Sequence, residues 1–296
     1  VINNCGSGIY YKTINPKNSD GSRPNTYTCQ GKSYAPTIDT ASSICGNTIT
    51  VVDTADTSSK QFPYGIRLYG ENLTANDGIV LAGDYSAQNV NVSSNNITIS
   101  RGANAIWLVG TKNINVSQNT VLFNNSAYST KDNVFGLRLE NSTNATINAN
   151  TINANNIPYV QNVIILDKSK GVNIAGNTLT GAKKHGINLT SSSASISANT
   201  ISGNKENGIF CYKNSTMTTN KNRITGNKKH GIFVNECKGK SKINGDTIQS
   251  NKQCGIAVQK GNNVTINSAK ISKSGKNGIY IFKKSKATIN KCTVSN

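Results

Sequence analysis

The sequence has little of the material from which helical or membrane proteins are built. It contains one Met and four Glu among 296 residues, and only 35% of the chain is hydrophobic and 15% charged. Much of the remainder is Asn, Ser, Thr and Gly, and Asn, Thr and Gly are weak helix formers. These scarcities exclude a predominantly helical fold. No apolar run reaches the ~18 residues of a membrane-spanning helix, so no membrane span is expected.

Acidic side chains and aromatic rings are also scarce. The chain has 13 Asp and Glu against 32 Lys and Arg, a formal net charge of +19 at pH 7. Residues 1–180 hold 12 basic and 10 acidic side chains, whereas residues 181–296 hold 20 basic and 3 acidic ones. This excess favours a polyanionic partner for the C-terminal half, and the alternative is that lysines only keep a long sheet surface soluble. With 6% aromatic residues and no zinc-finger spacing or RNP motif, nucleic acid is disfavoured relative to an anionic polysaccharide.

One short motif recurs along the chain. It is a tetrad of the type Gly-Ile-x-Val, whose first apolar positions are separated by 22 to 31 residues. The tetrads are Gly78–Leu81, Ala105–Leu108, Gly136–Leu139, Val163–Leu166, Gly186–Leu189, Gly208–Cys211, Gly231–Val234, Gly255–Val258 and Gly278–Ile281. Two more short alternating segments follow each tetrad, which predicts three half-buried strands in every repeat of about 23 residues. Stacked repeats of this kind share one continuous core.

An Asn recurs two residues before the third strand's apolar residue. The row contains Asn95, Asn119, Asn150, Asn177, Asn199 and Asn222, and Asp246 continues it. Stacked Asn side chains are expected to hydrogen-bond from coil to coil. The full pattern Asn-x-Ile-x-x-Asn-x-x-x-Gly-Ile occurs from Asn199 to Ile209 and again from Asn222 to Ile232. It resembles the right-handed parallel β-helix of the pectate-lyase-like superfamily, from about residue 47 to the end. The resemblance implies an all-β solenoid, and it is compatible with polysaccharide lyases, glycoside hydrolases, epimerases, tailspikes and adhesins.

The whole chain, residues 1–296, is expected to form a single β-helix domain. Gly8–Tyr11 matches the tetrad, residues 12–46 are predicted to be a loop insertion rich in Pro, Gly and Ser, and Gly65–Leu68 is predicted to be a second strand of the following coil. No polar end cap is recognisable at either end. Because solenoids need caps, flanking sequence or another chain is expected to cover the ends, and the chain is expected to be a fragment of a longer one.

The clearest candidates for chemistry lie on the outward side of the tetrad strands. If the register holds, Glu140 and Asp167 are neighbours on adjacent coils about 4.8 Å apart, with Arg138 beside Glu140. Paired carboxylates suit a retaining glycosidase. The same cluster suits a lyase or epimerase in which Arg138 removes a sugar proton, and Ca²⁺ is expected only if the protein is a lyase. Trp107 offers a flat face for a sugar ring, and the alternative is a plain surface salt bridge between Arg138 and Glu140.

Two further sets of ionisable residues are weaker candidates. Asp77 and Asp84 flank a tetrad, and a pair at this spacing is similar to the catalytic pair of β-helix lacto-N-biosidases, although Asp beside Gly is commonly a turn former. His185 and His230 occur in the same Lys-Lys-His-Gly context, two coils apart. This separation is too large for shared metal ligation, so no metal site is predicted. Both are predicted to be turn residues within a basic rail, and a general base at His185 is the alternative.

Lysines form two rails beside the tetrad strands, one before and one after them. Between the rails lie outward residues expected to contact substrate. The predicted binding residues are Trp107, Asn188, Phe210, Tyr212, Phe233, Tyr280, Lys184, Lys205 and Lys229. Rings edged by ammonium groups suit a polyuronate or sulfated glycan, whereas recurrence of a Lys-rich turn also follows from repeat duplication alone.

The seven cysteines include no CxxC pair, so a zinc site is poorly supported. Cys5, Cys29 and Cys45 bracket the insertion and two of them could staple it, while Cys211 is predicted to be a small buried apolar residue. The combined prediction is an extracellular or cell-surface carbohydrate-active enzyme, a lyase, hydrolase or epimerase, acting on an acidic polysaccharide. The alternative is a non-catalytic adhesin, stalk or fibre subunit that binds an anionic surface through its lysine-rich coils.

Overall fold

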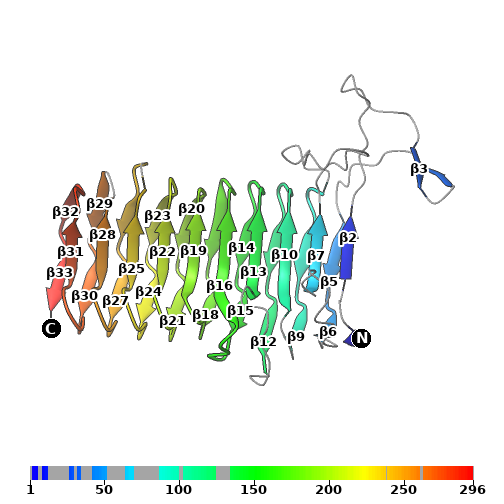
Figure 1. Cartoon of the computed structure of the whole chain (residues 1–296), viewed down its shortest axis with the longest axis horizontal. Coiled ribbons are helices and arrows are strands. Elements are labelled where there is room, and N and C mark those ends of the chain that lie inside the picture. Colours follow the sequence, from blue (N-terminus) through cyan, green and yellow to red (C-terminus); the bar gives the residue numbers. More distant parts are fainter. Residues whose placement is uncertain are drawn as a thin grey trace.

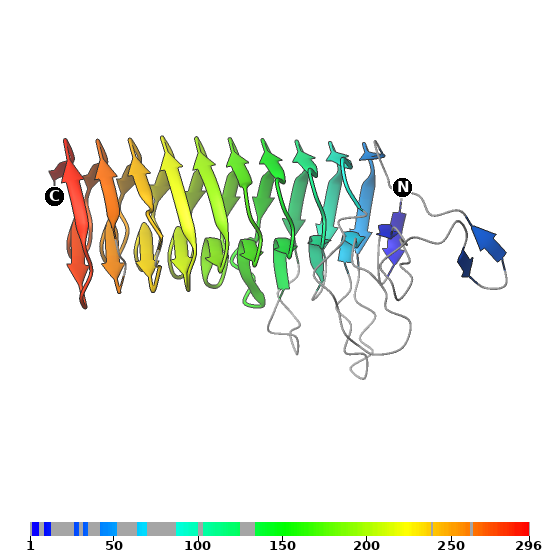
Figure 2. The same cartoon turned by 90° about the horizontal axis from the view of Figure 1, so that it is seen from above.

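The chain winds into a solenoid of three parallel β-sheets that runs along the long axis of the molecule (Figures 1 and 2). The computed structural model describes residues 2–5, 9–12, 27–29, 32–34, 42–51, 64–69, 87–99, 103–124, 134–237, 239–260 and 263–295. Successive strands of the chain enter sheet 1, sheet 2 and sheet 3 in turn, and strands at equivalent positions pair in parallel. The predicted all-β solenoid with three short strands per coil is confirmed.

The strands of each sheet follow in chain order. Sheet 1 contains β2 (Ile9–Lys12), β7 (Tyr64–Tyr69), β10 (Asn104–Val109), β13 (Val134–Glu140), β16 (Val160–Asp167), β19 (His185–Thr190), β22 (Ile209–Tyr212), β25 (Ile232–Asn235), β28 (Ile256–Gln259) and β31 (Ile279–Phe282). Sheet 2 contains β5 (Ser43–Cys45), β8 (Asn91–Ser93), β11 (Asn115–Ser117), β14 (Thr146–Asn148), β17 (Val172–Ala175), β20 (Ser193–Ser197), β23 (Thr216–Asn220), β26 (Lys242–Asn244), β29 (Val264–Asn267) and β32 (Ala287–Asn290). Sheet 3 contains β1 (Ile2–Cys5), β6 (Thr48–Val51), β9 (Asn96–Ile99), β12 (Thr120–Phe123), β15 (Thr151–Asn153), β18 (Thr178–Thr180), β21 (Thr200–Ser202), β24 (Arg223–Thr225), β27 (Thr247–Gln249), β30 (Lys270–Ser272) and β33 (Thr293–Ser295). A separate hairpin joins β3 (Tyr27–Cys29) to β4 (Lys32–Tyr34) in antiparallel pairing.

The apolar pair of each tetrad fills the core. Ile106 and Leu108 on β10 are fully buried, as are the residues in register with them on β13, Leu137 and Leu139. The glycine that opens a tetrad is required by this packing, because a Cβ added at Gly208 would lie 2.7 Å from the carbonyl oxygen of Gly231. The glycine therefore recurs because the backbone of the adjacent coil and a core isoleucine approach this position too closely to leave room for a Cβ.

The Asn row forms the predicted ladder. The Oδ1 atom of Asn199 accepts hydrogen bonds from the backbone amide and the side-chain Nδ2 of Asn177, both at 2.9 Å. Asn199 in turn donates from Nδ2 to Asn222 Oδ1 at 2.9 Å. These side chains are buried, so the ladder satisfies polar groups that would otherwise destabilise the interior. Asp246 ends the ladder and accepts from the amide and Nδ2 of Asn222.

The N-terminal coils differ from the prediction at one strand. Residues 65–68 lie on β7 in sheet 1, where Ile66 is in register with Ile106 and with Ile9 of β2. The prediction that they form a second strand of a coil is wrong, and Arg67 is therefore the outward neighbour of Trp107. The physical reason is the glycine: a Cβ at Gly65 would lie 2.6 Å from the carbonyl oxygen of Ala105, as the tetrad packing requires. The tetrad at residues 78–81 lies outside the described residues.

The expected insertion, residues 12–46, contains the β3–β4 hairpin and, near its end, β5, which pairs with β8 in sheet 2. Residues 13–26, 30–31 and 35–41 of this segment lie outside the described part of the chain, as do Asp77 and Asp84.

Candidate functional site

Three columns of side chains run along the outer side of sheet 1, perpendicular to its strands. The leading column contains Tyr64, Asn104, Phe135, Asn162, His185, Asn207, His230, Cys254 and Asn277. The central column contains Arg67, Trp107, Arg138, Ile165, Asn188, Phe210, Phe233, Ala257 and Tyr280. The trailing column contains Val109, Glu140, Asp167, Thr190, Tyr212, Asn235, Gln259 and Phe282.

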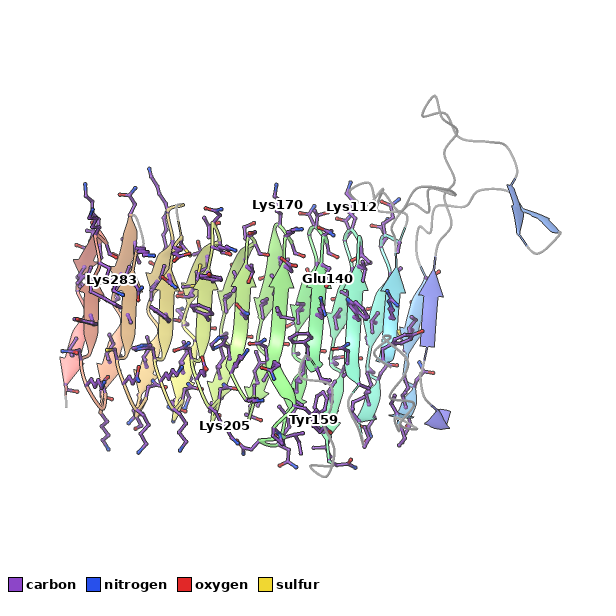
Figure 3. All side chains as sticks on the ribbon, in the orientation of Figure 1. Lys112, Glu140, Tyr159, Lys170, Lys205 and Lys283 are labelled. Carbon is purple, nitrogen blue, oxygen red and sulfur yellow. The ribbon has the colours of Figure 1, made fainter. Side chains whose placement is uncertain are left out.

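The structure brings Glu140 and Asp167 together. They are register partners on β13 and β16, and Arg138 lies two residues before Glu140 on β13. The predicted juxtaposition is therefore present, although its catalytic role stays a prediction. Glu140 forms an ion pair through Oε1 with the Arg138 guanidinium and accepts a hydrogen bond through Oε2 from Trp107 Nε1 at 3.3 Å. Figure 3 shows Glu140 near the middle of the sheet 1 surface.

Trp107 lies between two arginines contributed by the neighbouring strands. The guanidinium carbon of Arg67 is 4.1 Å from the indole centroid, and that of Arg138 is 5.1 Å from it. Cation–π contacts of this kind hold the three side chains in a stack. The indole faces are thus next to guanidinium groups, and a sugar stacking on Trp107 would have to displace one of them.

Arg138 is half-buried among charges of both signs. Burial lowers the pKa of the Arg138 guanidinium, the negative charge of Asp167 acts in the opposite direction, and the positive charge of Arg67 lowers it again. Burial disfavours the charged form of any cation, whereas an adjacent carboxylate favours it. The cluster therefore balances a desolvated cation against two carboxylates on the same surface.

Several buried polar atoms on the outer face of sheet 1 lack a hydrogen-bond partner. In the described part of the chain they include Asn104 Nδ2, Arg138 Nε, Asn162 Oδ1, Asn188 Oδ1 and Asn235 Oδ1, all on the three columns. Leaving such a group unpaired costs on the order of 1–3 kcal/mol. Donors and acceptors that are already desolvated and clustered on one sheet face are suited to a polar ligand.

His185 departs from the prediction of a turn residue, because it begins β19 and is only 5% exposed. Its Nδ1 accepts from the backbone amide of Asn207 at 3.4 Å, and its Nε2 lies 3.8 Å from Glu206 Oε2. Burial, with the positive charges of Lys184 and Lys229, lowers the pKa of His185 to about 3. The ring is therefore neutral at neutral pH, with its proton on Nε2, and it acts as a hydrogen-bond donor on this side.

His230 repeats this arrangement two coils further along. Its Nδ1 accepts from the backbone amide of Cys254 at 3.2 Å, and burial lowers the pKa of His230 to about 4. Its backbone amide donates to Asn207 Oδ1 at 3.1 Å, so Asn207 links the two histidines. The leading column is thus a polar ladder built into the sheet surface.

Aromatic rings occupy the next part of the central and trailing columns. Phe210 stacks on Phe233 with ring centroids 5.3 Å apart, and it stacks equally closely on Tyr212. Tyr280 stacks on Phe282 at 4.6 Å and is 44% exposed. The predicted aromatic residues therefore share one face, and their contact with substrate stays a prediction.

Lysines border this face on both sides. Lys184 and Lys205 are exposed, while Lys229 pairs with Glu206 at 3.1 Å. Figure 3 places Lys205 at one edge of sheet 1 and Lys112 and Lys170 at the other. Lys112 and Lys170 were not among the predicted lysines, and contact of Lys184, Lys205 and Lys229 with substrate stays a prediction.

Other kinds of site find little support in the described residues. No group of three or more His, Cys, Asp or Glu side chains within the described ranges could hold a metal ion. Two open depressions of about 790 and 460 Å³ lie on the sheet 2 surface, away from the three columns. Among the described residues, no helix is long and apolar enough to span a membrane.

Three contributors to the face were missed by sequence reasoning. Arg67 was detectable, because residues 65–68 repeat the Gly-apolar-Arg-Leu pattern of residues 136–139. Asn104 and Asn162 each lie two residues before the first inward residue of a tetrad strand. A strict period of two would place such a residue on the inward side, with the core residue, so sequence reasoning does not find it on the outer face.

Comparison with known proteins agrees with this architecture. The family model for the right-handed β-helix region matches residues 77–248 and 230–296. The periplasmic alginate epimerase AlgG is 15% identical with a TM-score of 0.56, over 98% of this chain and 70% of AlgG. The A-module of the mannuronan C-5 epimerase AlgE6 from Azotobacter vinelandii is 12% identical with a TM-score of 0.56, over 83% of this chain and 68% of that one. The AlgE4 A-module from the same organism is 10% identical with a TM-score of 0.54, over 84% and 76%. No curated protein matches the sequence.

Proposed function

The chain belongs to the right-handed β-helix family, and we propose that it binds and acts on an acidic polysaccharide along the outer face of sheet 1. One observation carries the proposal. In the described residues, buried polar atoms without hydrogen-bond partners, among them Arg138 Nε, Asn162 Oδ1 and Asn188 Oδ1, lie on β13 and β16, which carry Glu140 and Asp167, and on the adjacent strand β19. A glycan supplies the hydroxyls and carboxylates that such atoms require.

The borders of the face favour an anionic glycan. Lys184 and Lys205 are exposed at one edge, and Arg67 and Arg138 present guanidinium groups around Trp107. Guanidinium groups recognise carboxylates through paired hydrogen bonds, and ammonium groups attract them at longer range. The alginate and mannuronan epimerases that share the fold act on polysaccharides, as their names state, which supports this substrate class. Such a substrate implies an extracellular or cell-surface location.

The reaction that fits the cluster best is proton abstraction beside a uronate carboxylate, as in a lyase or an epimerase. Burial lowers the pKa of the Arg138 guanidinium, the direction required of a group that removes a proton, while the negative charge of Asp167 opposes this shift. The contacts of Glu140 with Arg138 and Trp107 hold that guanidinium in place. A retaining glycosidase is the alternative, but it needs one protonated carboxyl group.

The proposal is tested by incubating the protein with alginate and pectate. Unsaturated uronates report a lyase, inverted uronate residues seen by NMR report an epimerase, and new reducing ends alone report a hydrolase. Arg138→Lys, Glu140→Gln and Asp167→Asn should each lose most of the activity. Glu236→Gln is the matched control, because Glu236 pairs with Lys260 at 3.0 Å outside the cluster. Full activity in both Glu140→Gln and Asp167→Asn would contradict the site.

A non-catalytic adhesin remains the second candidate because of the lysine borders. Residues 181–296 carry 20 basic and 3 acidic side chains, and Lys205, Lys213, Lys252 and Lys260 are exposed. A chain that binds anionic glycan without forming product, and whose affinity survives Glu140→Gln and Asp167→Asn, would establish this function instead.

A further inference from the structure

Two cysteines on neighbouring coils each replace the residue type that recurs at their own position of the repeat. Cys211 occupies an inward position of sheet 1 where its register partners are Leu189 and Val234. Cys237 occupies a corner position that holds a buried hydroxyl on earlier coils. Those hydroxyl residues are Thr111, Ser142, Ser169, Ser192 and Ser215. Cys211 thus stands where the neighbouring coils have an aliphatic residue, and Cys237 stands where earlier coils have a serine or threonine.

The corner position identifies Cys237 as the successor of the serines. Ser169 Oγ donates to the carbonyl oxygen of Asp167, two residues earlier, at 3.0 Å. Ser192 Oγ makes the same contact with Thr190 at 2.7 Å. Cys237 Sγ lies 3.5 Å from the carbonyl oxygen of Asn235, again two residues earlier. A serine would therefore fit this corner.

The two thiols meet in the interior. Cys211 Sγ and Cys237 Sγ are 3.1 Å apart, and the residues are 0% and 1% exposed. A disulfide requires a separation of about 2.05 Å, so a shift of about 1 Å would join them.

We propose that Cys211 and Cys237 are a disulfide-forming pair, which links adjacent coils beneath the aromatic part of the sheet 1 face. Each thiol loses its proton, one Sγ–Sγ bond forms, and two electrons pass to a low-molecular-weight disulfide, which is reduced to two thiols. The exchange passes through a mixed disulfide on one of the two cysteines. Cys211 lies between Phe210 and Tyr212 on β22, so the bond anchors the strand that carries these rings.

The bond has a measurable consequence for stability. The two cysteines are 26 residues apart in sequence, and closing a loop of this length restricts the unfolded chain. For a chain of this size we expect the melting temperature of the oxidised protein to exceed that of the reduced protein by about 10 °C. The effect is independent of any activity on polysaccharide.

Peptide mapping tests the proposal on the unmodified chain. The protein is refolded with glutathione disulfide, its free thiols are alkylated after denaturation, and its peptides are analysed by mass spectrometry. We expect a linked peptide pair containing Cys211 and Cys237, lighter than the two reduced peptides by two hydrogen atoms. Alkylation of both cysteines, or linkage of either one to a different thiol, would overturn the proposal.

Matched variants supply a second readout. Cys211→Val introduces the residue found at the next positions of its column, and Cys237→Ser introduces the residue found at earlier corners. Each should remove most of the difference in melting temperature between oxidised and reduced protein. Cys254→Ala is the control, because Cys254 is buried in the leading column and should leave that difference unchanged. A difference that persists in both matched variants would refute the pairing.

Discussion

Asp246 ends the asparagine ladder, and replacing it by asparagine should make the protein more stable. Asp246 is fully buried, and its Oδ1 accepts from the amide of Asn222 at 2.7 Å and from Asn222 Nδ2 at 2.8 Å. Its Oδ2 accepts a short hydrogen bond from the hydroxyl of Thr219. Asp246→Asn keeps Oδ1 as an acceptor and removes a buried negative charge.

The magnitude follows from the hydrogen bonds that change. On the preceding rungs the asparagine Nδ2 also donates to a main-chain carbonyl oxygen, as Asn222 does to Ile196 at 2.9 Å. The equivalent oxygen for residue 246 is that of Thr219, which is in register with Ile196. The hydrogen bond from Thr219 to Oδ2 is exchanged for one from Nδ2 to that hydroxyl oxygen. One hydrogen bond to the Thr219 carbonyl oxygen is gained, which contributes about 1 kcal/mol, and relief of the buried charge adds to it. We expect a gain of about 1–2 kcal/mol at neutral pH, or roughly 3–6 °C in melting temperature.

The pH dependence distinguishes this mechanism from a general stabilisation. Burial raises the pKa of Asp246, although its hydrogen bonds with Thr219 and Asn222 oppose the rise. Protonation therefore favours the folded state, and the wild type loses stability as the pH rises above the usual range of an aspartate. The advantage of Asp246→Asn should be largest at neutral and alkaline pH and should shrink toward about pH 4.

Thermal melting followed by circular dichroism over this pH range measures the effect. Asn199→Asp is the reciprocal control, because it places a second carboxylate in the same ladder and should destabilise the protein increasingly as the pH rises. An Asp246→Asn variant that is less stable than the wild type at neutral pH, or whose advantage does not change with pH, would refute the reasoning.

Two further predictions concern the sheet 1 face. The pKa of His185 is lowered to about 3 in the folded protein. Below about pH 6.5 the unfolded chain therefore binds a proton at this residue that the folded chain does not bind, and the free energy of unfolding falls by about 3 kcal/mol near pH 4. His185→Asn, which introduces the residue found at neighbouring leading-column positions, should flatten this acid loss in thermal melts, and an unchanged acid profile would exclude His185 as its cause. Polyuronate binding, followed by the fluorescence of the single Trp, should weaken steeply with salt. Lys184→Ala with Lys205→Ala should weaken binding and reduce this salt dependence, whereas Lys270→Ala, at an exposed position on sheet 3, should not; equal effects would contradict the location of the binding face.

The architecture could be predicted because repetition amplifies a weak local signal. A single Gly-Ile-x-Val segment is compatible with many strands, but nine of them at similar spacing require equivalent positions to stack. That stacking is why the juxtaposition of Glu140 with Asp167 was accessible from sequence. The same regularity caused the error at β7, because even spacing favoured residues 78–81 over residues 65–68 as the strand preceding β10.

The remaining features of the face depend on where the chain enters sheet 1 and on contacts between residues that depart from the repeat. His185 was expected in a turn because lysines precede it, yet the chain enters sheet 1 at this residue and buries its ring. Cys211 was correctly predicted to be buried. Its contact with Cys237 was not predicted, because it joins β22 to the corner that follows β25, the next strand of sheet 1. Such contacts cross between coils at positions that differ within the repeat, so periodicity alone does not pair them.

A crystal structure of the protein with a bound oligouronate would test the central claim most directly. The account predicts an oligosaccharide lying along the outer face of sheet 1 across β10, β13, β16 and β19, with a uronate carboxylate in contact with Arg138 and with polar atoms of Asn162 and Asn188 newly paired. Binding confined to the surface of sheet 2 or sheet 3, with those atoms still unpaired, would contradict it.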